Sequence, residues 1–133
     1  MRGSFFMTGG KYMQLNFLDG AFSVLKVDEL APEMLRKPFV FAACTEDECS
    51  LVCRTQDKPD RHIACEDGWA AFRAAGTLDF SLVGVLAGIT CALAEARVGV
   101  FVVSTYDTDY VLIKEERHRD AMRALESAGY TVS

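Results

Sequence analysis

The alternation of hydrophobic and polar positions is clearest in the C-terminal half of the chain. Residues 69–75 predict a strand that ends at Gly76. Residues 80–97 predict a helix, because their apolar residues recur with the period of one helical face. That stripe consists of Leu82, Val85, Leu86, Ile89, Leu93 and Ala96. This half of the chain therefore begins with a strand and an amphipathic helix.

The residues after this helix extend the same pattern. Residues 98–104 are β-branched and almost continuously apolar, which indicates a strand covered on both faces. Residues 106–109 predict a turn into a strand at 110–114, and Gly129 ends a second helix. Its buried stripe is Ala121, Met122, Leu125 and Ala128, and a short strand at 130–132 follows. The order β-α-β-β-α-β predicts an α+β, ferredoxin-like fold, with antiparallel sheets and helices on one face.

The N-terminal half reads as a weaker copy of this arrangement. Residues 13–18 and 21–27 predict a hairpin about the turn Asp19-Gly20. Residues 30–36 predict a short helix that Pro38 ends. The remaining expected elements are a second hairpin at 39–44 and 49–54, a polar loop at 56–61 in place of a second full helix, and a short strand at 62–65.

These patterns divide the chain into three parts. Residues 1–12 are expected to form a loose or tag-like tail. Residues 1–10 carry one positive charge and no apolar core, so they do not predict a secretory signal. Residues 13–66 form a degenerate N-terminal module and residues 67–133 a complete C-terminal one. The connector Glu66-Asp67-Gly68 is too short for a flexible tether, so the two modules are expected to pack together.

Charge and hydropathy exclude two classes of partner. The 133 residues carry a formal net charge of −5, and the sequence pI is about 5.0. A nucleic-acid binder needs a basic surface, as does a protein that adheres to an anionic membrane. The longest apolar run, residues 82–94, is interrupted and falls short of the ~20 residues that span a bilayer. We therefore expect neither nucleic acid nor membrane as a partner.

The five cysteines predict a reducing environment. Their positions, 44, 49, 53, 65 and 91, fit neither a zinc ribbon nor a C-x-x-C redox pair. Cys49, Leu51 and Cys53 alternate along one strand face, where free cysteine packs as a small hydrophobe. We expect five reduced thiols, with Cys44, Cys53 and Cys91 at least half buried, and hence a cytoplasmic protein. No metal and no cofactor are expected.

Two stretches carry a family resemblance. Residues 78–87 lead into the first helix, and residues 98–112 contain a Ser-Thr-Tyr-x-Thr-Asp run flanked by aliphatic residues. Together they resemble the paired ACT-domain proteins, which include the CASTOR-type arginine sensors and, more distantly, the regulatory region of aspartate kinases. The resemblance covers residues 67–133 and implies tandem ACT modules that bind a small ligand, usually an amino acid. The CASTOR-type sensors carry four modules and this chain two, so arginine remains only one candidate.

The resemblance also implies where the ligand lies. One wall is the opening of the first helix, where backbone N–H groups attract a carboxylate, and the other is the start of the second strand. The corresponding residues are Ser81, Leu82, Val83 and Gly84 for the first wall and Val98, Gly99 and Val100 for the second. Asp79, Asp107 and Asp109 are the nearest carboxylates for an ammonium group.

Each of these assignments has a structural alternative. Asp79 fits a helix cap equally well. Gly84 and Gly88 also fit a helix that packs closely on its sheet, and Asp107 and Asp109 fit a tight turn between strands. The ligand site and the structural reading therefore both stay open at these positions.

The sequence favours a binding protein over an enzyme. It holds no phosphate-binding glycine loop, and its two histidines stand in contexts that suggest no nucleophile–base pair. We expect a non-catalytic regulatory protein that binds an amino acid or similar ligand. We also expect it to form a homodimer, because the apolar strands at 98–103 and 110–113 need cover on both faces. The alternative is an oligomerisation module whose pocket is vestigial.

Overall fold

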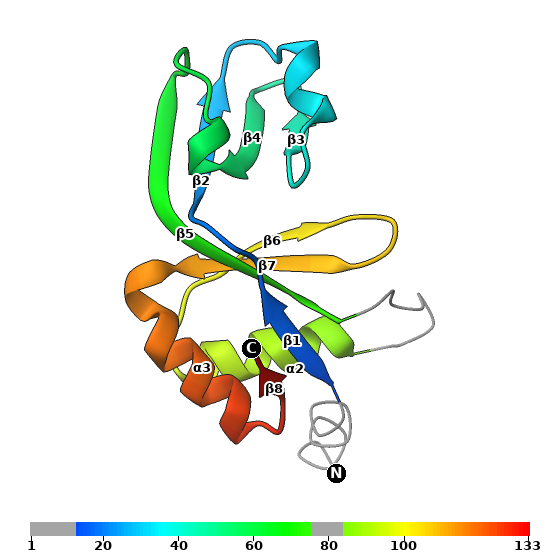
Figure 1. Cartoon of the computed structure of the whole chain (residues 1–133), viewed down its shortest axis with the longest axis vertical. Helices are drawn as coiled ribbons and strands as arrows, with labels where there is room; N and C mark the ends of the chain where they lie inside the picture. The colour runs from blue at the N-terminus through cyan, green and yellow to red at the C-terminus, as the bar shows by residue number, and fades with distance from the viewer. Residues whose placement is uncertain (1–12, 76–83) are drawn as a thin grey trace. The chain divides into compact units, whose positions relative to one another are not determined.

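The computed structural model describes residues 13–75 and 84–133, which form a mixed α+β structure (Figure 1). The chain divides into two compact units. The large unit combines the N-terminal end of the chain, up to Leu18, with Ala70–Ser133, and the small unit is Asp19–Trp69. Strand β5 (Ala64–Ala74) runs through the boundary between them.

The described part of the large unit contains five strands in the order β6-β7-β5-β1-β8. They are β1 (Gln14–Phe17), β5, β6 (Phe101–Ser104), β7 (Asp109–Lys114) and β8 (Thr131–Val132). Helix α2 spans Val85–Glu95, and a 3₁₀ turn, η3 (Glu115–Arg117), leads into α3 (His118–Ser127). The predicted order β-α-β-β-α-β is confirmed from β5 onwards.

Both helices share one hydrophobic core with the strands. The fully buried residues at its centre come from β1, β5, β7, α2 and α3, and include Leu15, Phe72, Leu93, Ile113 and Leu125. The predicted stripes explain this, because Ile89 and Leu93 on α2, and Ala121 and Leu125 on α3, all lie within the core. Periodicity of the apolar residues therefore identified the inward faces of both helices.

The predicted hairpin between residues 13–18 and 21–27 is wrong. Strand β1 pairs with β5 in antiparallel fashion, with Leu15 opposite Ala74, and with β8 in parallel, with Leu15 opposite Val132. The Phe17 ring packs 5.1 Å from the Phe72 ring. Gly20, at a φ of 86°, still turns the chain, but the turn leads from one unit into the other. A run of alternating residues indicates a strand without naming its partner.

The small unit is a four-stranded antiparallel arrangement in the order β3-β4-β2-β5. Its strands are β2 (Phe22–Val27), β3 (Phe41–Cys44), β4 (Cys49–Arg54) and the first half of β5. Two 3₁₀ turns, η1 (Pro32–Arg36) and η2 (Thr55–Asp57), stand where a complete module would carry helices. The core of this unit is a separate cluster made of Leu25, Val27, Met34, Leu51 and Cys53.

The predicted break between a strand at 62–65 and another at 69–75 is also wrong, because β5 is continuous. Phe22 pairs with Trp69, yet Val24 pairs with Glu66, so β5 carries one extra residue at this point. Gly68 adopts a φ of 83°, which a residue without Cβ tolerates readily. The Glu66–Gly68 segment is therefore a β-bulge and not a connector.

The strand predicted at 98–104 begins only at Phe101. Its side chains are not covered on both faces, since Val100 and Val102 are 38% and 36% exposed. The described strands place β7 on one side of β6 and none on the other. An apolar edge strand is consequently left open in the single chain.

Candidate functional site

Six of the ten predicted ligand-binding residues lie within the described structure. They are Gly84, Val98, Gly99, Val100, Asp107 and Asp109. The other four, Asp79, Ser81, Leu82 and Val83, lie outside the described residues.

Gly84 stands immediately before α2, so this helix begins at Val85 and not at residue 80 as the sequence predicted. The φ of Gly84 is 86°, in the left-handed region, and its carbonyl accepts a hydrogen bond of 2.9 Å from the N–H of Gly88. The first N–H groups of α2 follow Gly84 and have no partner within the helix. Glycine is required here for its backbone conformation, whatever else it does.

Residues 98–100 connect α2 to β6 and do not begin a strand. Val98 is only 4% exposed, and its N–H donates to the carbonyl of Leu93 at 2.9 Å, so it closes the end of α2. Gly99 has open space beside it, because a Cβ there would meet no atom within 4 Å. Gly99 and Val100 are accessible to a ligand, whereas the side chain of Val98 belongs to the core.

Asp107 and Asp109 belong to the turn between β6 and β7. The N–H of Thr105 donates to the carbonyl of Thr108 at 2.8 Å and closes a four-residue loop that contains Asp107. Asp109 accepts a hydrogen bond of 2.5 Å from the Ser104 hydroxyl, directly across the hairpin. Asp109 therefore holds the turn together, while the side chain of Asp107 is exposed.

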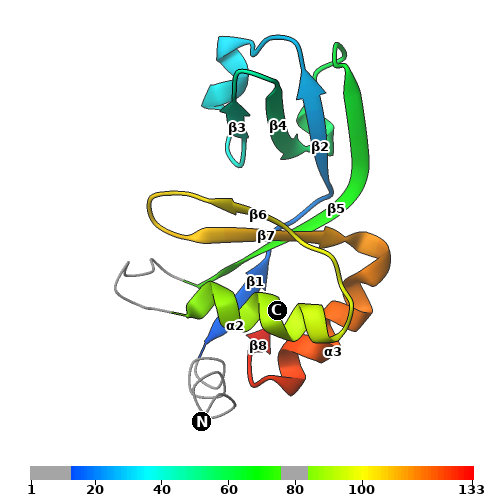
Figure 2. The ribbon, with the colours of Figure 1, turned by 180° about the vertical axis from the view of Figure 1, so that it is seen from behind.

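The predicted residues separate into two groups at opposite ends of α2. This helix has 11 residues and is therefore about 16 Å long. Gly84 precedes it and residues 98–100 follow it. Both views of the ribbon show the β6–β7 turn at the same end of the large unit as the start of α2 (Figures 1 and 2). Gly84 and Asp107 thus share one end of the unit, and Gly99 lies at the other.

The small unit contains a polar cluster that sequence reasoning missed. Asp67, at the bulge of β5, accepts hydrogen bonds from Ser23 (2.5 Å), Lys58 (3.1 and 3.2 Å) and the thiol of Cys65 (3.3 Å). The hydroxyl of Ser23 also lies 2.8 Å from that of Thr55. No residue-type pattern marks this cluster, because it depends on the register shift at Gly68.

The electrostatics of the cluster favour a structural role. The hydrogen bond from Ser23, followed by that from Lys58, lowers the pKa of Asp67 to about 2. Burial and the bond to Asp67 raise the pKa of Cys65, so its thiol stays protonated and is a poor nucleophile. The cluster links η2 to β5 and supplies no obvious chemistry.

A second feature that the sequence did not reveal is a cavity of about 120 Å³ in the small unit. Its lining comes from the end of β2 and the segment after it, from η1 and from β4, together with two residues of the loop after η2. The residues are Val27, Asp28, Glu29, Leu30, Ala31, Met34, Leu51, Pro59 and Arg61. All of them lie within Asp19–Trp69, so the cavity belongs to this unit alone.

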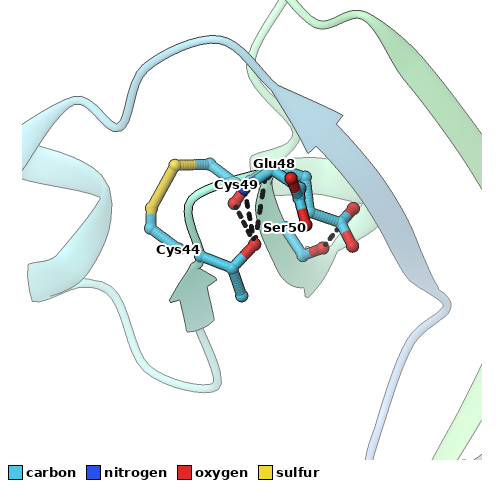
Figure 3. Close-up of a disulfide and its surroundings, with 6 residues drawn as sticks. Cys44, Glu48, Cys49 and Ser50 are labelled. Atoms are coloured by element: carbon cyan, nitrogen blue, oxygen red, sulfur yellow. Dashed lines mark hydrogen bonds between the residues drawn. A yellow bond between two sulfur atoms is a disulfide. The ribbon is translucent and has the colours of Figure 1, made fainter.

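Cys44 and Cys49 form a disulfide, which corrects the prediction of five reduced thiols (Figure 3). The two residues lie directly opposite each other in the β3–β4 hairpin, with Cα atoms 4.1 Å apart. The sequence signal was their spacing across the turn 45–48, which the strand-face argument overlooked. Cys44 is also exposed, contrary to prediction. The expectation of a cytoplasmic location rested on reduced cysteines and loses that basis.

The remaining three cysteines are free. Cys53 is fully buried, as predicted, and burial, with a smaller contribution from Asp57, raises its pKa to about 11. Within residues 13–75 and 84–133, no three histidine, cysteine or acidic side chains gather in a way that could hold a metal ion. In the same residues, no helix is long and apolar enough to cross a membrane.

Comparison with known proteins relates this architecture to a family. The chain is similar to the Agobacterium tumefaciens protein Atu0741, at 27% identity and a TM-score of 0.80, over 91% of this chain and 92% of that one. It is also similar to the Vibrio cholerae protein VC0802, described as a possible transport protein, at 17% identity and a TM-score of 0.72, over 96% and 98%.

A third similar structure is the regulatory subunit of aspartate kinase from Thermus thermophilus. Its identity is 15% and its TM-score 0.59, over 84% of this chain and 93% of that one. No curated protein sequence gives a significant match. The family model of the ACT domain matches residues 64–127, the segment from β5 to the end of α3. Residues 64–127, slightly less than half of the chain, therefore match the ACT-domain family.

Proposed function

We propose that this protein is a regulatory ligand-binding protein, without catalysis of its own, whose ligand is an amino acid or a molecule of similar size. The observation that carries the proposal is the ACT domain at residues 64–127. The similar Thermus thermophilus structure is the regulatory subunit of aspartate kinase, and the likeness extends over 93% of it. We read Asp19–Trp69 as a degenerate second module, because it repeats the hairpin of the large unit.

We further propose that the chain acts as a homodimer and binds its ligand where two copies meet. The supporting observation is the open edge of β6, where Val100 and Val102 are exposed. Within one chain, Gly84 and Gly99 lie at opposite ends of α2, too far apart to hold one amino acid. A second copy would supply Gly99 and Val100 opposite the helix opening and Asp107 of the first.

A thermal-shift screen against the twenty amino acids tests the proposal. A ligand at 100 times its dissociation constant adds ~2.7 kcal/mol to the free energy of unfolding. That corresponds to a rise of several degrees in Tm for a chain of this size. Sedimentation at micromolar concentration should show a dimer. A dimer whose Tm responds to no amino acid would instead support the oligomerisation module.

A further inference from the structure

We propose that Asp19–Gly20 is a modification site, at which the aspartate isomerises to isoaspartate without an enzyme. The reaction needs no cofactor, because the backbone nitrogen of the glycine attacks the side-chain carboxyl of the aspartate before it. The site lies outside the ACT match at 64–127. It is therefore independent of the ligand binding proposed above.

The chemistry of this step involves no oxidant and no reductant. A bond forms between the nitrogen of Gly20 and Cγ of Asp19, and the amide proton leaves with a carboxyl oxygen as water. The product is a five-membered succinimide. Water then adds to one of its two carbonyl groups. Addition at Cγ restores aspartate, whereas addition at the backbone carbonyl leaves the chain connected through the side chain, which is isoaspartate.

The sequence contains the pair Asp-Gly twice, at 19–20 and at 67–68. The two glycines adopt nearly the same backbone conformation, with φ angles of 86° and 83°. A Cβ at either glycine would meet no atom within 4 Å, so both nitrogens can be approached closely. The glycines therefore do not distinguish the two pairs, and their reactivity depends on how each aspartate is held.

The first pair is unrestrained. Asp19 and Gly20 are both exposed and lie in the bend between β1 and β2. Within residues 13–75 and 84–133, nothing forms a hydrogen bond or an ion pair with the Asp19 carboxyl or with the N–H of Gly20. No existing interaction has to break before the nitrogen attacks, and water has access to the succinimide that forms.

The second pair is protected by the polar cluster of the small unit. Asp67 accepts hydrogen bonds from Ser23 (2.5 Å), Lys58 (3.1 and 3.2 Å) and Cys65 (3.3 Å). Attack by Gly68 would have to displace these charge-assisted bonds. The bonds from Ser23 and then Lys58 also lower the pKa of Asp67 to about 2. An ionised carboxylate resists attack, because it has no hydroxyl group to lose.

Isoaspartate would alter the turn that leads from β1 into the small unit. Before the turn, the N–H of Leu18 donates to the carbonyl of Ala71, and after it the N–H of Thr55 donates to the carbonyl of Ala21, both at 2.8 Å. Isomerisation adds one methylene group to the backbone between these two anchored residues, 18 and 21. We therefore expect the modified protein to have a lower Tm than the fresh protein.

The test is incubation of the full chain in H₂¹⁸O at mildly acidic pH, followed by tryptic digestion and mass spectrometry. Each passage through the succinimide introduces one ¹⁸O atom. Trypsin releases the two pairs separately, in the peptides of residues 12–26 and 62–73, and each peptide contains a single aspartate. We expect at least about tenfold more label at Asp19 than at Asp67, because Asp67 first has to lose hydrogen bonds to a charged group. Fragmentation spectra should identify isoaspartate at position 19.

Three variants identify the chemistry. Asp19→Glu would have to close a six-membered ring, which is much slower, and should abolish the label in residues 12–26. Asp19→Asn reaches the same succinimide by loss of ammonia, a better leaving group, and should form isoaspartate faster than the parent. The fresh Asp19 variants should keep the Tm of the parent, because this side chain is exposed. Lys58→Met removes the charged partner of Asp67 and should raise the label in residues 62–73.

Equal labelling of the two aspartates, or absence of label at Asp19, would overturn the proposal. Label in residues 12–26 that persists in Asp19→Glu would place the reaction at another residue and overturn it as well. An unchanged label at Asp67 in Lys58→Met would contradict protection by hydrogen bonding. The amino-acid screen of the proposed function uses fresh protein, so its result is independent of all these outcomes.

Discussion

Two β-hairpins of the described residues, β3–β4 and β6–β7, lie sixty residues apart in the sequence and differ in the interaction that joins their strands beside the turn. The β3–β4 hairpin closes with a bond of 2.7 Å from the N–H of Thr45 to the carbonyl of Glu48, and the β6–β7 hairpin repeats it at 2.8 Å with Thr105 and Thr108. Each is followed at once by a 3₁₀ turn, η2 or η3. The same backbone plan therefore occurs twice.

The two hairpins differ in the interaction between the facing residues that flank each turn. The Thr–Glu or Thr–Thr bond makes the next pair a non-hydrogen-bonded one, in which facing side chains lie closest. In the small unit that pair is the disulfide Cys44–Cys49, and in the large unit it is the hydrogen bond from Ser104 to Asp109. The same backbone geometry thus supports a disulfide, which a reductant breaks, in one hairpin and a hydrogen bond, which a reductant leaves intact, in the other.

The chain also diverges after the two 3₁₀ turns. In the large unit η3 continues into α3, whose Ala121 and Leu125 seal the core. In the small unit the residues after η2 are polar, and Pro59 blocks a helix. Pro59 and Arg61 then cover the core incompletely, which accounts for the cavity between them and Met34. The pocket therefore lies where the small unit has no helix equivalent to α3.

The largest expected effect comes from the helix that only the large unit has. Leu125 is fully buried, so Leu125→Ala should lower the free energy of unfolding by about 3 kcal/mol, as truncation of a core leucine usually does. Urea unfolding measures this, and Glu126→Ala on the exposed face of α3 should change it by less than ~0.5 kcal/mol. A small effect of Leu125→Ala would mean that α3 does not seal the core.

Reduction of the disulfide should have the next largest effect. Cys44 and Cys49 close a short loop, and the loss of this constraint costs about 2 kcal/mol. Dithiothreitol should therefore lower the Tm of the parent by several degrees. The double variant Cys44→Ser with Cys49→Asp copies the pair of the large unit and should show the same Tm with and without reductant. A response that persists in this variant would have to come from another cysteine.

A smaller effect on stability is expected at Arg117 of the large unit and at Asp57, the residue sixty positions earlier in the small unit. Arg117 donates to the carbonyls of Arg97 (2.9 Å) and Ala96 (3.4 Å) and so closes the end of α2. Sixty residues earlier, Asp57 and Lys37 form only a loose ion pair at 3.7 Å. Arg117→Ala should cost ~1 kcal/mol or more, because it strips carbonyls of charge-assisted bonds, and Asp57→Ala less than ~0.5 kcal/mol. Thermal melts that rank the two variants in the opposite order would contradict this.

The smallest expected effect is a loss of folding stability at acidic pH that arises from Asp67 in the small unit. The pKa of Asp67 falls from 3.8 to about 2 on folding, so its charged form stabilises the folded state. That contribution is complete above pH 4 and disappears as the pH falls from about 4 to 2. Asp67→Asn should flatten the stability profile in this window and leave its shape above pH 5 unchanged. Chemical unfolding at several pH values would detect the difference.

Sequence reasoning succeeded where local pattern determines structure. The faces of α2 and α3 follow from the spacing of residues such as Leu93 and Leu125, and both hairpins follow from turn residues between apolar runs. Sequence reasoning failed where the structure of a segment depends on a pairing strand that is distant in the sequence. Leu15 alternates as any strand residue does, and nothing near it indicates pairing with Ala74 and Val132. From the sequence alone, Gly68 resembles a linker residue, and only the register between β5 and β2 identifies it as part of a bulge.

The candidate site shows the same division. Gly84 at a helix opening and Asp109 in a turn were readable from neighbouring residues, including the structural alternative for Asp109. The predicted helix between Gly84 and Gly99 already implied that its length separates the two residues. The family resemblance nevertheless led us to assign both to one pocket. The cavity of the small unit needs Val27, Met34, Leu51 and Arg61 together, and these meet only in the folded chain.

The pairing of β1 with β8 has a consequence for biosynthesis. Residues 19–69 form a continuous segment and have all their partners once β5 has been made. The large unit is interrupted by that segment, and Leu15 must wait for Val132 before its strand is complete. Contacts so far apart in sequence form slowly, because a long loop has to close first. On the ribosome, the small unit should therefore fold first, and β1 should complete its pairing only after β8 has been made.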